Sequence, residues 1–308
     1  MKILITGSRG FVGGSVGQFA ARLGHEVLGV SRAAQPAADW PGAYVSADVV
    51  GADLSQTFRD FAPDAIFHAA GPASVGASFA TPLDDLRASL LSFANVLNCA
   101  RRSTLQPLLL FPSSGAVYGQ LDKLPVAEDA ALRPISPYGF HKAASELLAR
   151  EYSTCFGQRV IVCRLFSLFG AAQRRLLVWE LFQQFAGAEQ TVWLQGSGAE
   201  TRDYLSAHDM ATAVLELIET QRELMEPGAY NVVNLSSGVE TRVLDLAKQI
   251  GKLVAPEKEI RCRGLKRAGD PERWQADISR LQTMAPGWNP EPFAQALTNC
   301  IERWKKNS

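Results

Sequence analysis

A glycine-rich turn near the start of the chain constrains the fold more than any other feature. Lys2–Thr6 is a short apolar run that predicts a buried strand, and apolar residues recur at helical spacing over 15–23. Between them lies Gly7-Ser-Arg-Gly10-Phe-Val-Gly13. A strand, a glycine turn and a helix in this order predict a dinucleotide site, because the glycines let the backbone approach a pyrophosphate and the helix N-terminus offers free N–H groups. The residues expected to contact the cofactor are Gly7, Gly10, Phe11, Val12 and Gly13.

Beyond the turn, apolar runs alternate with helical patterns. Strands are expected at 26–30, 43–47, 64–68, 107–112 and 159–163, with helices at 54–61, 82–102 and 136–156. This alternation predicts an α/β fold, a Rossmann-type doubly wound parallel sheet covered on both faces. Past residue 170 the pattern loosens into helices at 174–186, 207–221, 241–252 and 292–306 and a strand near 191–194. We expect a dinucleotide-binding domain of residues 1–170, to which 203–235 returns, and a smaller C-terminal substrate-binding region of 171–202 and 236–308.

The end of the second expected strand bears on the choice of cofactor. NAD-binding folds usually carry an acidic residue there for the ribose 2′-hydroxyl, whereas this chain has Ser31 and Arg32. Arg32 could pair with a 2′-phosphate, and Arg9 in the glycine turn could reach the same group. The sequence therefore favours NADP(H), with NAD(H) possible; the alternative is that both arginines are simply solvated. Asp48 is placed to accept a hydrogen bond from an adenine amino group.

A tyrosine and a lysine four residues apart form a candidate catalytic pair. Tyr138 and Lys142 fall on one face of an expected helix. An ammonium beside a phenol favours phenolate, so we expect Lys142 to lower the pKa of Tyr138 from its usual value of about 10. That change would make Tyr138 a usable proton donor and acceptor. The alternative is an exposed helical pair without function.

Composition and charge disfavour several other classes. The 31 basic and 31 acidic residues give a formal net charge of zero, which gives no electrostatic reason for binding nucleic acid. Because no apolar run is long enough to span a membrane and no leader precedes the first strand, we expect a cytoplasmic protein without a membrane partner. The five cysteines and four histidines are scattered, so we expect neither disulfides nor a metal site.

Several segments, in order, resemble the extended short-chain dehydrogenases/reductases, and within them the NAD(P)-dependent sugar-nucleotide epimerase/dehydratase family. The resemblance covers nearly the whole chain. The matching segments are Thr6–Gly13, His68–Ala70, Phe111–Gly119, Tyr138-x-x-x-Lys142, Gln195–Tyr204, Lys266–Asp270 and Gly287–Pro290.

This resemblance implies a catalytic set of Ser114, Tyr138 and Lys142. Ser114 would bond the sugar C4 oxygen, Tyr138 would exchange its proton, and Lys142 would hold the nicotinamide ribose. The resemblance also implies a nucleotide-diphosphate sugar as substrate, with Arg202 and Arg267 clamping the diphosphate unless they form surface salt bridges. Further residues implied to line the cofactor are Val49, Ala69, Ala70, Gly71 and Ser113, and further residues implied to bind the substrate are Ser167 and Asp270.

The family resemblance carries two further expectations. A homodimer is expected through helices 82–102 and 136–156. His68 is expected to pack beneath the cofactor, and His141 to face away from Tyr138.

Departures from the family pattern bear on the reaction. Ser167 and Ser89 stand where the family usually has asparagine, and Gly115-Ala116 where dehydratases have Asp-Glu. Without that acid pair, dehydration is disfavoured. Two reactions at C4 are left: NADPH-dependent reduction of a nucleotide-diphospho-4-keto-6-deoxysugar, as in deoxysugar synthesis for surface polysaccharides, and 4-epimerisation with tightly held NAD(P). Ser31-Arg32 favours the reductase. A non-catalytic NADP(H)-binding scaffold is a minor alternative, disfavoured because Tyr138 and Lys142 are both present.

Overall fold

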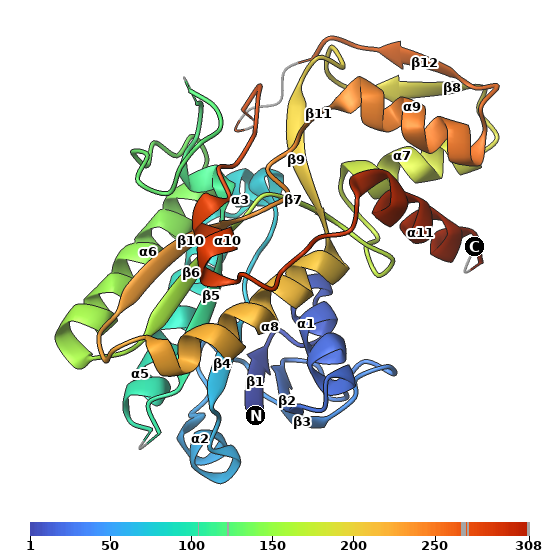
Figure 1. Cartoon of the computed structure of the whole chain (residues 1–308). Helices are drawn as coiled ribbons and strands as arrows, with labels where there is room; N and C mark the ends of the chain where they lie inside the picture. The colour runs from blue at the N-terminus through green and yellow to red at the C-terminus, as the bar shows by residue number, and fades with distance from the viewer. Residues whose placement is uncertain (104, 122, 266–268, 270, 307–308) are drawn as a thin grey trace.

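The fold is built on one seven-stranded parallel sheet (Figure 1). The computed structural model describes residues 1–308 except 104, 122, 266–268, 270 and 307–308. The strand order is β10-β6-β5-β4-β1-β2-β3, and every neighbouring pair is parallel. The strands are β1 (Lys2–Thr6), β2 (Glu26–Ser31), β3 (Ala43–Ser46), β4 (Ala65–His68), β5 (Leu108–Ser114), β6 (Val160–Leu165) and β10 (Tyr230–Leu235).

Helices cover both faces of this sheet because its strands are apolar on both sides. Ile3 and Ile5 of β1 face a core shared with α1 and α8, whereas Leu4 faces the opposite core, shared with α2, α5 and α6. The prediction of a doubly wound α/β fold is confirmed. The helices are α1 (Phe11–Arg22), α2 (Ser55–Phe61), α3 (Val75–Ala80), α4 (Pro82–Leu86), α5 (Ser92–Arg101), α6 (Pro137–Phe156), α8 (Ala207–Leu224) and α10 (Ser279–Met284).

The single helix expected over 82–102 is interrupted. A π turn, η1 (Arg87–Leu91), lies between α4 and α5. The hydroxyl of Ser92 donates to the carbonyl of Ala88 at 2.5 Å, so a side chain competes with the backbone where the helix widens.

A smaller part of the chain carries a core of its own, at the upper right of Figure 1. It contains a three-stranded sheet, β11 (Glu240–Arg242), β9 (Thr201–Ser206) and β7 (Ser167–Phe169), and a parallel pair, β12 (Glu259–Cys262) and β8 (Thr191–Leu194). Its helices are α7 (Leu177–Ala186), α9 (Val243–Val254) and α11 (Phe293–Lys306). Although β10 follows β9 in sequence, it pairs with β6 in the main sheet. The domain boundaries drawn from the sequence stay a prediction.

Within the described part of the chain, no helix is long and apolar enough to cross a membrane. The same residues contain no group of three or more His, Cys, Asp or Glu side chains that could hold a metal ion.

Candidate active site

The three predicted catalytic residues meet at the carboxyl edge of the main sheet. Ser114 is the last residue of β5, and Tyr138 and Lys142 lie in the first turns of α6. That helix begins at this edge because Ser136 caps it, accepting from the Gly139 N–H at 3.2 Å, and because Pro137 suits the first helical position. The Ser114 side chain lies close enough to Tyr138 to act on the pKa of its phenol, and all three catalytic candidates are buried.

Burial, and not the neighbouring lysine, controls the proton affinity of Tyr138. Desolvation raises the pKa of Tyr138 to about 12, against the opposing effect of the Ser114 hydrogen bond. The expectation that Lys142 lowers this pKa is therefore wrong for the protein without a cofactor. The Lys142 ammonium donates to the Pro112 carbonyl at 2.8 Å and lies 4.7 Å from the centre of the Phe111 ring, compared with 5.8 Å for the Tyr138 ring.

Lys142 is itself destabilised as a cation. Burial lowers the pKa of Lys142 to about 8, and the carboxylates of Asp85 and Glu146 oppose that change. The ammonium therefore depends on nearby negative charge to persist at neutral pH.

The glycine turn has the shape that a dinucleotide pyrophosphate needs. Gly7 has φ +69°, and a β-carbon there would lie 2.6 Å from the backbone of Ala69 and Ala70. A β-carbon on Gly13 would lie 2.5 Å from the Gly7 carbonyl oxygen. No side chain caps the N-terminus of α1, and the buried hydroxyl of Ser8 has no hydrogen-bond partner among the described residues. These residues fit a bound dinucleotide.

The residues predicted to determine the preference for NADP(H) over NAD(H) lie at or near the end of β2. Arg9 donates from Nη1 to the Gln35 carbonyl at 2.8 Å, which brings its guanidinium to the loop that follows Arg32. Arg32 is exposed, and Ser31 closes β2. On the next strand connection, Asp48 is exposed and Val49 is buried. Their contacts with a cofactor stay predictions.

The end of β4 contributes buried, uncharged residues to the carboxyl edge of the sheet. His68 is bonded to the Thr6 hydroxyl at 2.8 Å and stacks on Phe93 with 5.2 Å between ring centres. Burial lowers the pKa of His68 to about 3, so the imidazole is neutral. Ala69 and Ala70 follow directly, and Gly71 has φ +148°. His68 is thus packed in the core, and its position beneath a cofactor stays a prediction.

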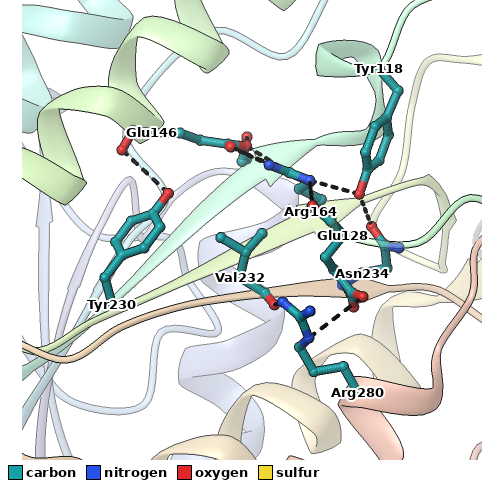
Figure 2. Close-up of polar contacts among 9 residues, drawn as sticks. Tyr118, Glu128, Glu146, Arg164, Tyr230, Val232, Asn234 and Arg280 are labelled. Atoms are coloured by element: carbon teal, nitrogen blue, oxygen red, sulfur yellow. Dashed lines mark hydrogen bonds and ion pairs between the residues drawn. The ribbon is translucent and has the colours of Figure 1, made fainter. Parts of the chain in front are cut away.

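The structure contains a buried polar network next to the site that the sequence analysis did not predict (Figure 2). The Ser113 hydroxyl donates to Glu146 at 2.5 Å, and its predicted contact with the cofactor stays a prediction. Arg164 joins Glu146 at 2.7 Å and also donates to the Tyr118 hydroxyl at 2.8 Å. That hydroxyl in turn donates to Asn234 of β10 at 2.6 Å. The only sequence signal was the position of Glu146, four residues past Lys142 on the same helix face.

The expected substrate residues are only partly described. Arg202 donates from Nη1 to the carbonyls of Thr201 and Pro271, at 2.7 and 3.0 Å, and lies 5.6 Å from the Trp274 ring centre. Ser167 begins β7 and pairs with Tyr204 of β9, so it lies beside the strand that carries Arg202. Arg267 and Asp270 fall outside the described residues.

Comparison with known proteins agrees with this geometry and assigns a family. The model of the NAD dependent epimerase/dehydratase family matches residues 3–233, so the chain belongs to that family. It is therefore a nucleotide-sugar-modifying enzyme that uses a nicotinamide cofactor.

Individual relatives are named for different activities. A UDP-glucose 4-epimerase of Mycolicibacterium smegmatis is 27% identical, over 100% of both chains. A GDP-6-deoxy-D-mannose reductase of Pseudomonas aeruginosa is 30% identical, over 79% of this chain and 81% of its own. Among solved structures, a UDP-N-acetylglucosamine 4-epimerase of Methanobrevibacter ruminantium shares the fold with a TM-score of 0.89 at 22% identity, covering 100% of this chain and 99% of its own.

Proposed function

We propose that the protein is a nucleotide-sugar 4-epimerase that oxidises and re-reduces C4 of a nucleotide-diphosphate sugar. The observation that carries this proposal is the placement of Ser114, Tyr138 and Lys142 together, buried at the carboxyl edge of the main sheet. It is supported by the relatives named as UDP-glucose 4-epimerases, which align over the whole chain.

Each catalytic residue has a distinct task in this proposal. The Ser114 hydroxyl orients the sugar C4 oxygen, and Tyr138 takes up or returns its proton. Lys142, as an ammonium, binds the ribose and favours the phenolate. When bound, the nicotinamide supplies the hydride transfer. All three side chains are buried, so their polar groups act in a region of low polarity.

The two residues after Ser114 lack the acidic side chains that dehydratase chemistry needs. Gly115 lies against Phe166, whose ring would be 3.3 Å from an added β-carbon, and Ala116 is buried. No carboxylate occupies either position, which disfavours removal of water from the sugar.

Substrate binding is assigned to the second part of the chain. Arg202 and Arg267 would clamp the diphosphate, with Ser167 and Asp270 contacting the nucleotide sugar. Such a clamp suits arginine, whose planar fork matches two phosphate oxygens.

NADPH-dependent reduction of a 4-keto-6-deoxysugar nucleotide is the second candidate. It is favoured by Ser31-Arg32 at the end of β2, where an acid would select NAD(H), and by the similarity to the Pseudomonas aeruginosa reductase.

One isotope experiment separates the two reactions. The protein is incubated with UDP-glucose, and separately with a GDP-linked 4-keto-6-deoxysugar, each with excess C4-deuterated NADPH. An epimerase interconverts UDP-glucose and UDP-galactose without consuming reductant or gaining deuterium. A reductase consumes one NADPH per keto sugar and places deuterium at C4. If neither occurs, and other nucleotide sugars are also unchanged, both candidates are wrong.

A further inference from the structure

The backbone of Tyr138 is held by a serine from another helix. The Tyr138 N–H donates to the hydroxyl oxygen of Ser78 on α3 at 3.0 Å, and that hydroxyl donates to the Val75 carbonyl at 2.7 Å. Because its proton is used by Val75, the Ser78 oxygen turns a lone pair towards the Tyr138 N–H. Ser78 is completely buried, so solvent does not compete for this bond.

This bond completes the capping of the catalytic helix. The N–H groups in the first turn of an α-helix have no acceptor inside the helix. In α6 the proline at the first position has no N–H, the Gly139 N–H donates to the Ser136 hydroxyl, and the Phe140 N–H donates to the Ser136 carbonyl at 3.0 Å. The Tyr138 N–H is the one left over, and its acceptor comes from α3.

The next turn of the catalytic helix is tied to α4 instead. His141 donates from Nδ1 to Asp85 of α4 at 2.6 Å, and the two side chains are 14% and 3% exposed. His141, which we expected to face away from Tyr138, turns towards α4. Its bond holds a side chain, whereas the bond to Ser78 holds the backbone of the proposed catalytic tyrosine itself.

We propose that Ser78 is a positioning residue of the active site, which sets the place of the Tyr138 phenol by fixing the backbone from which that side chain extends. The inference rests on the proposed role of Tyr138 in proton exchange at C4. Such exchange needs the phenol oxygen within hydrogen-bond reach of the sugar oxygen. A displacement of about 1 Å in a reacting group can lower the rate by about 10²-fold. Ser78 belongs to neither the predicted catalytic set nor the predicted binding set.

The test removes the Ser78 hydroxyl in Ser78→Ala, which leaves the Tyr138 N–H without this acceptor. The matched control is Ser153→Ala. Ser153 is a buried serine, 1% exposed, near the other end of α6, where its hydroxyl donates to the Ala149 carbonyl at 3.1 Å. Each variant loses one buried hydroxyl bonded to the backbone of the catalytic helix, so a general loss of stability would appear in both.

Two NMR readouts report on Tyr138 without any substrate. Protein labelled with ¹⁵N- and ¹³Cζ-tyrosine gives signals from six tyrosines, and those of Tyr138 are assigned by their loss in Tyr138→Phe. In Ser78→Ala the Tyr138 amide should exchange with deuterium about tenfold faster or more, and the ¹³Cζ signal of its ring should shift. In Ser153→Ala both signals should match the parent.

An unchanged exchange rate or an unchanged ring signal of Tyr138 in folded Ser78→Ala would overturn the proposal. If that variant does not fold, Ser78→Cys places a weaker acceptor of similar shape at the same position and is held to the same two criteria.

Turnover provides a third readout. With C4 activity measured per cofactor-bound site, kcat of Ser78→Ala should fall by about tenfold or more while KM for the nucleotide sugar stays within about twofold, because the loss concerns the reacting proton and not binding. Parental kcat in Ser78→Ala would contradict the positioning role. Altered Tyr138 signals together with no C4 activity in any variant, the parent included, would reject the proposed function and support the placement of Tyr138 by Ser78.

Discussion

Arg164 and Glu146 form an ion pair of 2.7 Å whose side chains are only 5% and 4% exposed. The pair joins β6 to the catalytic helix (Figure 2), and Glu146 also accepts a hydrogen bond from Ser113. Because neither charge is free to reach water, each depends on its partner, and removing one leaves the other uncompensated in a region of low polarity.

Arg164→Met should therefore destabilise the fold by about 3–5 kcal/mol. Urea unfolding followed by circular dichroism measures this loss. The exposed pair of Glu259 and Arg261 provides the control, since Arg261→Met removes a solvent-screened contact and should leave the stability nearly unchanged. Equal costs for the two variants would show that the buried pair contributes no more than a surface one.

Tyr138→Phe should lower turnover by about 10²-fold or more, because it removes the exchanged proton and keeps the ring. Cofactor affinity, measured by fluorescence titration, should persist. Tyr152→Phe removes a hydroxyl further along α6 and should retain parental turnover. Near-parental activity in Tyr138→Phe would show that Tyr138 does not exchange the substrate proton.

Arg32→Asp should weaken NADP(H) binding by about tenfold or more and improve NAD(H) binding, because an attractive contact with a 2′-phosphate becomes repulsive. Calorimetric titration with both cofactors measures the change. Arg22→Asp, at the other end of α1 from the glycine turn, controls for net charge. Unchanged NADP(H) affinity would leave Arg9 as the remaining candidate for this contact.

Acid should destabilise the protein through His68. Its pKa is about 3 when folded and about 6.5 when unfolded, so the unfolded state binds the extra proton in this window. The stability that His68 contributes is complete above pH 6.5 and is lost as the pH falls towards 3, at up to about 1.4 kcal/mol per pH unit. Urea unfolding at pH 7, 5.5 and 4.5 measures the slope, which His68→Gln should reduce and exposed His208→Gln should not.

We propose a homodimer through the helices over 82–102 and 136–156, because this surface exposes Leu83, Leu91, Phe140 and Leu147. Leu147→Glu should convert the dimer to a monomer in sedimentation velocity. Leu224 on α8 is equally exposed, at 71% compared with 70%, so Leu224→Glu is a matched control that should stay dimeric. A monomeric parent protein would contradict the proposal at the outset.

The sequence predicted well those features that are set by residues close together in the chain. The glycine turn, the first strand and the Tyr138–Lys142 helix face are local patterns, and their placement follows from helix and strand periodicity. By contrast, Glu146 meets Arg164 and Asp85 meets His141 across different elements, so no spacing rule reveals either pair. Strand β9 was not predicted because it contains a polar residue, Asp203, that is fully buried. Donors from distant segments, the Ser237 hydroxyl and the Ala276 N–H, satisfy its carboxylate.

The pKa expectation for Tyr138 failed for a related reason. Position on a helix face reveals which charges are near, but it does not reveal how dry the site is. Desolvation, which depends on the packing of α3, α4 and β5 around α6, was the larger effect.

The late return of the chain at β10 has a consequence for synthesis on the ribosome. Tyr118 and Glu128 are bonded to Asn234, more than one hundred residues further along, and β6 has no outer neighbour until residues 230–235 emerge. A nascent or truncated chain that ends near residue 170 would leave β6 as an open sheet edge, available to pair with another chain. Such a fragment should aggregate, and the first half of this protein is therefore not a portable cofactor-binding module.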